Sequence, residues 1–93
     1  MNISIDELSR LLDSAENENI EFKAARTEYS NEKATKYCVA LANEGGGRLI
    51  LGVTDKLPRS IVGTKAFPNL SKLKAHISQH LPFRIDTQEL MTD

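Results

Sequence analysis

Cysteine and long apolar runs are almost missing from this sequence. Cys38 is the only cysteine among 93 residues, so no disulfide can form within the chain. No apolar stretch approaches the roughly 20 residues that span a bilayer. Residues 1–13 also lack the basic start and apolar run of a signal peptide. These absences favour a cytoplasmic protein.

Aromatic residues are also few, with two tyrosines, three phenylalanines and no tryptophan. We interpret most of them as core residues, so base stacking on aromatic rings has little support in the sequence. Hydrophobic residues make up 40% of the chain and charged residues 27%, which is typical of a globular protein. We expect a single domain over residues 1–93, without repeats or low-complexity tracts.

Charge is distributed unevenly along the chain, although the net charge is only −1. Residues 22–84 contain 11 of the 12 basic residues but only four of the 13 acidic ones. Such asymmetry fits a basic face for phosphates beside an acidic patch. It fits equally well a domain in which the blocks pair with each other, and the sequence leaves both interpretations open.

Apolar periodicity predicts a mixed α/β fold with the element order α-β-α-β-β-α-β. Ser4 and Glu7 form a capping box at the first helix, and Asn43 with the glycines after it ends the second. The predicted helices cover residues 5–13, 31–42 and 69–80, and the predicted strands cover 20–23, 48–53, 60–63 and 83–88. The chain stops just after the last predicted strand, so we expect a fragment of a longer protein.

Three segments, taken in order, resemble one known family. They are Glu16 with Ile20-Glu21-Phe22-Lys23, then Ala40 to Val53 with its Asn43-Glu44-Gly45-Gly46-Gly47 passage, then Asp55 followed by Ile61-Val62-Gly63. Together they are similar to the N-terminal half of the Schlafen AlbA-like domain. The sequence departs from the family pattern after Asp55, where Lys56-Leu57-Pro58 replaces the usual glycine-containing turn.

The resemblance implies an AlbA-like mixed sheet packed with helices, and a nucleic-acid-binding module, with DNA favoured over RNA. It also implies a parent chain with C-terminal domains, of the bacterial transcriptional-regulator or helicase-related kind, and the capacity to form a homodimer. Binding needs cations, because phosphate contacts dominate affinity for nucleic acids. The candidate cations are Lys23, Arg26, Lys33, Lys36, Arg48, Lys56, Arg59 and Lys65.

A metal-dependent endoribonuclease is an alternative function that the resemblance suggests. Some Schlafen proteins cleave RNA with carboxylates at positions similar to Glu16, Glu21 and Asp55. Carboxylate oxygens hold Mg²⁺ or Mn²⁺, and the metal activates water. The simpler interpretation is a solvent-facing strand residue, a loop residue and a turn residue, and it is the stronger one.

The glycine-rich passage is a further candidate site, formed by Asn43, Gly46 and Gly47, with Gly52 at the end of the next strand. Backbone N–H groups in such a loop can bind a phosphate, and relatives have been described as divergent ATPases. The chain has no Walker A motif, however, and a helix that must turn into a strand needs glycines anyway. A third functional class is a protein-interaction or dimerisation module that uses the exposed final strand as a pairing edge.

Overall fold

The computed structural model describes residues 3–14, 17, 19–82 and 84–91 of the chain. Within these residues the elements are α1 (Ile5–Leu12), β1 (Ile20–Lys23), α2 (Asn31–Asn43), β2 (Arg48–Leu51) and α3 (Leu70–His80). The predicted mixed α/β class is confirmed. Over the same described residues, no helix is both long and apolar enough to cross a membrane.

Each helix begins at a side chain that caps the first turn. The predicted capping residue Ser4 accepts a hydrogen bond from the Glu7 backbone N–H at 3.1 Å. Ser30 and Asn69 do the same for α2 and α3, each at 3.1 Å. Because the first N–H groups of a helix have no partner within it, these caps fix where the three helices start.

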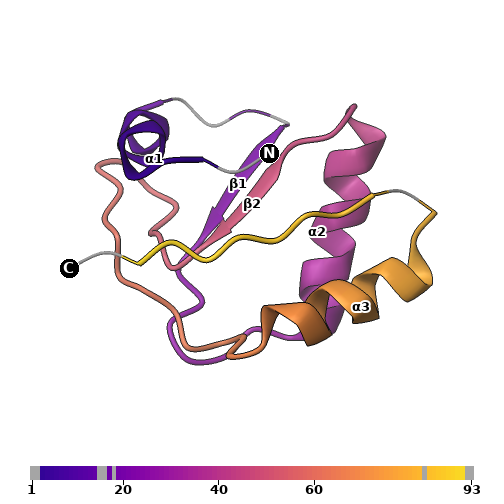
Figure 1. Cartoon of the computed structure of the whole chain (residues 1–93). Coiled ribbons are helices and arrows are strands. Elements are labelled where there is room, and N and C mark those ends of the chain that lie inside the picture. The colour runs from indigo at the N-terminus through magenta and orange to yellow at the C-terminus, as the bar shows by residue number, and fades with distance from the viewer. Residues whose placement is uncertain (1–2, 15–16, 18, 83, 92–93) are drawn as a thin grey trace.

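The sheet consists of two parallel strands, with Ile20 opposite Arg48 and Lys23 opposite Leu51. Parallel neighbours need a long crossover connection, and α2 supplies it. In Figure 1, α1 lies on one side of the two strands, and α2 and α3 lie on the other.

The two faces of the sheet bury different sets of apolar residues, because successive strand residues point to opposite faces. The face toward α1 buries a cluster of Ile20, Phe22 and Val53, with Leu11, Leu12 and Ile50 packed against it. The other face contributes Leu49 to a second cluster built on Ala34, Leu73 and Ile77. On β1 this second face carries Glu21 and Lys23. This face of the sheet is therefore apolar on β2 and charged on β1.

The predicted strand at residues 60–63 is reduced to a partial hairpin. Val53 and Ile61 form a single antiparallel bridge, and the Val62 N–H donates to the Gly52 carbonyl at 2.8 Å. Gly52 and Gly63 both have left-handed φ angles, +88° and +74°. Extended pairing cannot continue through such angles, so the ladder ends after one bridge.

The predicted strand at residues 83–88 is also not formed over its described part, 84–88, and Phe83 lies outside the described residues. The segment is held by side chains instead. The Gln88 amide accepts from the Ile3 N–H and donates to the Ile3 carbonyl, both at 2.8 Å, while Ile85 packs against the second cluster. The alternation of apolar and polar residues in this segment therefore indicates that one side of it packs against the core. Such packing does not require hydrogen bonds to a neighbouring strand.

Candidate nucleic-acid interface

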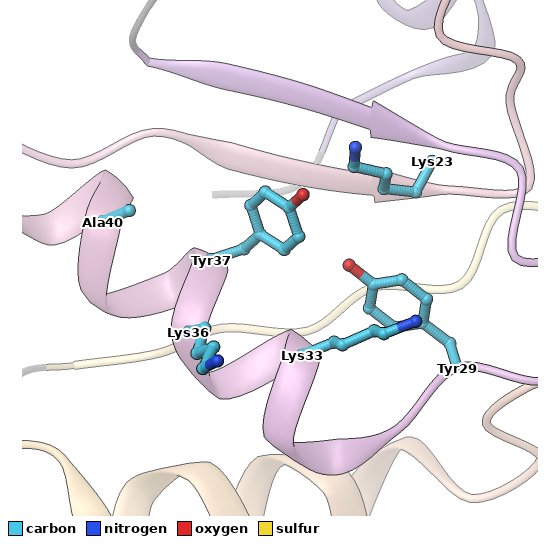
Figure 2. A pocket seen from close by; sticks show the side chains of 6 residues that line it. All are labelled: Lys23, Tyr29, Lys33, Lys36, Tyr37 and Ala40. Carbon is cyan, nitrogen blue, oxygen red and sulfur yellow. The ribbon is translucent and has the colours of Figure 1, made fainter.

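One pocket gathers cationic and aromatic side chains between β1 and α2. It has a volume of about 460 Å³ and is lined by Lys23, Tyr29, Lys33, Lys36, Tyr37 and Ala40. We call these six residues the lysine–tyrosine pocket. Figure 2 shows Lys23 reaching in from the strand, Tyr29 from the loop before α2, and the other four side chains along α2.

The position of Lys23 follows from strand alternation. Phe22 turns into the first cluster with no exposed surface, so Lys23 turns to the opposite face, toward α2. Its ammonium lies 5.0 Å from the centre of the Tyr37 ring. Hydrogen bonding to Tyr37 raises the pKa of Lys23, partial burial opposes this, and the charges of Glu21 and Asp55 add to the increase. Lys23 is therefore a fixed positive charge at neutral pH.

Tyr29 forms the deeper wall of the pocket. Its ring meets Phe67 edge to face, with centroids 6.2 Å apart at 82°, and the Lys33 ammonium lies 5.9 Å from its centre. Burial raises the pKa of the Tyr29 hydroxyl, which is shielded from solvent and has no hydrogen-bond partner among the described residues. A buried hydroxyl left in this way costs about 1–3 kcal/mol, so the wall is held by ring packing and not by its polar end.

The lysines of α2 share a face because of their spacing. Lys33, Tyr37 and Ala40 lie at positions i, i+4 and i+7 of the helix, which places them one above another. Lys36 is three residues from Lys33 and adds a second exposed cation at the rim. The described fold thus brings together three of the cations that the sequence suggested, namely Lys23, Lys33 and Lys36.

The other suggested cations lie elsewhere. Arg48 pairs with Ile20 at the far end of the sheet and lines a separate hollow with Glu7 and Arg10. Lys56 is exposed in the turn after Asp55, and Arg26 and Lys65 are exposed residues joined through their backbones. None of these four lines the lysine–tyrosine pocket.

Arg59 contacts two backbone carbonyls and an aromatic ring within the domain, and the sequence did not indicate these contacts. Its Nη1 donates to the Leu12 carbonyl at 3.0 Å and to the Ser14 carbonyl at 2.5 Å. The guanidinium also lies 4.3 Å from the centre of the buried Phe22 ring. A cation at the carboxyl end of a helix satisfies carbonyls that have no partner within it. Arg59 therefore fastens α1 to the sheet.

The carboxylates of the nuclease hypothesis are only partly described. Glu16 lies outside the described residues. Glu21 shares a face of β1 with Lys23, and the charges of Glu21 and Asp55 both raise the pKa of Lys23. Within the described parts of the chain, no three acidic, histidine or cysteine residues group as a metal site would require. Whether Glu16 completes such a group stays a prediction.

The glycine-rich passage closes α2. The Gly46 N–H donates to the Leu41 carbonyl at 2.8 Å and the Gly45 N–H to the Ala42 carbonyl at 3.1 Å, the paired bonds of a Schellman cap. Asn19 then donates from Nδ2 to the Glu44 and Gly46 carbonyls, both at 2.8 Å. The N–H groups of Gly45 and Gly46 therefore have partners within the fold, and the bonds from Asn19 connect the loop to the start of β1. Of the other candidate residues, Asn43 and Gly47 lie beside this cap. Gly52 lies at the opposite end of β2, where its N–H donates to the Lys23 carbonyl at 2.8 Å.

The sequence also matches a model of a known protein family. The family model described as Schlafen, AlbA_2 matches residues 16–92, which is more than four-fifths of the chain. The chain belongs to this family. Membership in the Schlafen AlbA_2 family is consistent with nucleic-acid binding or a related function. No curated protein and no solved structure matches the chain.

Sequence reasoning missed the aromatic part of the lysine–tyrosine pocket of this AlbA_2 domain. Tyr37 lies on the apolar stripe of α2 and was interpreted as core, yet it is half-exposed at the edge of that stripe and lines the pocket. The helical spacing of Lys33, Tyr37 and Ala40 was the available signal. Tyr29, by contrast, is placed by a loop, whose path no periodicity reveals.

Proposed function

We propose that this Schlafen AlbA_2 domain binds nucleic acid, and DNA in preference to RNA, through the lysine–tyrosine pocket. The observation that carries the proposal is the convergence of Lys23, Lys33 and Lys36 on one pocket from two separate elements. Phosphate contacts by such cations dominate the affinity of nucleic-acid-binding proteins. Family membership supports the same class of function.

The family resemblance also suggests the setting of this binding module. We place it in a larger protein of the transcriptional-regulator or helicase-related kind, which carries the regulatory or motor activity in other domains. The single cysteine, Cys38, fits a reducing compartment such as the cytoplasm. Burial raises the pKa of its thiol, so Cys38 stays protonated and contributes packing.

A salt titration tests the proposed function. We expect fluorescence-labelled DNA to bind the chain at low salt, with log Kd changing linearly with log salt. If the three pocket lysines each neutralise one phosphate of a duplex, the slope has a magnitude of about 3. The measurement is fluorescence anisotropy with duplex DNA, single-stranded DNA and structured RNA at several salt concentrations. Absence of binding at low salt would overturn the proposal and favour a protein-interaction module, which sedimentation would then examine.

A metal-dependent nuclease is the second candidate function, favoured by the shared influence of Glu21 and Asp55 on Lys23. Two carboxylates beside a lysine suit a metal ion and a scissile phosphate, because the metal activates water and the ammonium offsets phosphoryl charge. These carboxylates together with Glu16 would hold Mg²⁺ or Mn²⁺. We then expect the chain to cut RNA in the presence of Mn²⁺.

Substitution separates this nuclease activity from binding. Glu21→Gln and Asp55→Asn are each expected to reduce cleavage by at least about 100-fold, since each removes a charged metal ligand. The same changes leave the anisotropy titration without metal nearly unchanged. Glu44→Gln, an exposed carboxylate at the end of α2, is the matched control and keeps full cleavage. An RNA probe that stays intact with the unmodified chain would rule out this second function.

A further inference from the structure

The walls of the lysine–tyrosine pocket are mainly carbon, although its rim is cationic. Two phenol rings, the aliphatic stems of three lysines and the methyl group of Ala40 form the lining. A volume of about 460 Å³ lies within the range of small-ligand pockets. A lysine cluster that only followed a phosphate backbone would need neither the hollow nor the rings.

An aromatic pocket of this size suits one nucleobase better than a duplex. In a duplex the bases are stacked and paired inside the helix, and only phosphates and groove edges reach a protein surface. A single strand can turn a base outward onto an aromatic side chain while its phosphates contact nearby cations. The pocket offers both partners within one α2 face, Tyr37 for a base and Lys33 and Lys36 for phosphates.

We propose that the pocket selects single-stranded nucleic acid by receiving one unstacked base against Tyr37. This inference rests on the proposed function and adds the class of substrate. Both rings are half-exposed. Tyr37 is the receiving ring because Tyr29 is held against Phe67 with its hydroxyl buried. The Lys23 ammonium lies 5.0 Å from the Tyr37 ring centre. Lys23 also hydrogen-bonds Tyr37, so a base that stacks on this ring takes the place of the ammonium, which then binds the adjoining phosphate.

Ala40 controls entry of the base. It lies one helical turn beyond Tyr37 and is exposed, and its small side chain leaves the hollow open. A larger residue here fills the pocket without changing any charge. Leucine suits this purpose, because it favours helix almost as strongly as alanine does.

Intrinsic fluorescence gives a direct measurement of the pocket. The chain has no tryptophan, and both of its tyrosines line the pocket, so its ultraviolet emission arises from this site. We expect a single-stranded oligonucleotide to quench this emission, after correction for its own absorbance. A duplex of the same length competes at least about tenfold less well, since it offers no base for stacking. Equal competition by the duplex would overturn the inference.

Two variants test the base contact separately from charge. Tyr37→Leu removes the stacking ring and Ala40→Leu fills the hollow; each is expected to weaken single-strand binding about tenfold and to remove the preference over duplex. Binding of these variants is followed by anisotropy of a labelled strand, and circular dichroism checks their folding. The matched control is Ala75→Leu, the same change at an exposed position of α3 outside the pocket.

The outcomes distinguish this inference from the function on which it rests. If Tyr37→Leu and Ala40→Leu bind single strands normally while loss of the pocket lysines weakens binding, base reception is wrong and nucleic-acid binding stands. If the unmodified chain binds no nucleic acid at low salt, both proposals fail. Weaker single-strand binding in both variants, with Ala75→Leu unaffected, supports the inference.

Discussion

Replacing Lys23, Lys33 and Lys36 together with glutamine is expected to reduce affinity for nucleic acid about 100-fold at moderate salt. Each lysine that contacts a phosphate releases about one counterion, so the salt slope should also fall by about 3 for a duplex. Glutamine keeps most of the side-chain length and a similar helix propensity. The measurement is anisotropy of one labelled DNA across several salt concentrations.

A second triple variant with the same change in net charge is the control. Arg10, Arg48 and Lys72 are all exposed and lie outside the lysine–tyrosine pocket. Changing these three to glutamine is expected to alter affinity less than threefold, because long-range effects of exposed charges are screened within about 10 Å at 0.1 M salt. Equal losses in the two triples would mean that net charge, and not the pocket, determines binding.

Gly47→Ala is expected to destabilise the fold by about 2–4 kcal/mol, a large share of the stability of a domain this small. A Cβ at this position would lie 2.7 Å from the Asn19 carbonyl carbon and 3.0 Å from its Cα. The obstacle is backbone, which no rotamer change can move aside. Displacing Asn19 also disturbs its hydrogen bonds to Arg48, Glu44 and Gly46, each worth about 0.5–1.5 kcal/mol. Urea denaturation followed by circular dichroism measures the change.

Gly45→Ala is the matched control for Gly47→Ala. A Cβ at Gly45 meets nothing within 4 Å, although φ is +90°, so only the cost of a left-handed alanine remains, about 1–2 kcal/mol. A loss at Gly47 no larger than the loss at Gly45 would show that the Asn19 contact relaxes easily. The ordering of the two variants is therefore the informative result.

Local signals predicted the elements whose causes are local. The capping box at Ser4 placed α1, alternation placed β1 over residues 20–23 as observed, and the glycines after Asn43 placed the end of α2. Alternation failed at residues 84–88, because apolar alternation indicates a buried side and cannot specify a hydrogen-bonded neighbour. The predicted strand at residues 60–63 is reduced to a single bridge at Ile61, because left-handed glycines stop the ladder.

The site was predictable only in part, for a related reason. Lys23 could be assigned to the polar face of β1, and Lys33 and Lys36 to α2, from their spacing in the sequence. Their convergence depends on how β1 lies against α2, which the sequence did not reveal. The internal contacts of Arg59 could not be predicted, because its acceptors, Leu12 and Ser14, are more than 40 residues away in the sequence. The role of Glu16 as a metal ligand stays a prediction.

The hydrogen bonds between the Gln88 amide and the Ile3 backbone also bear on how firmly the two ends of the described chain are held together. Two neutral hydrogen bonds, both exposed to water, contribute about 1 kcal/mol each. Keeping each backbone residue ordered costs roughly 1–2 kcal/mol in entropy. The packing of Ile85 and the ion pair of Asp86 with Lys74 add to these bonds. We therefore expect this segment to open locally, while Phe22 and Ile77 remain buried, at a lower free energy than global unfolding requires.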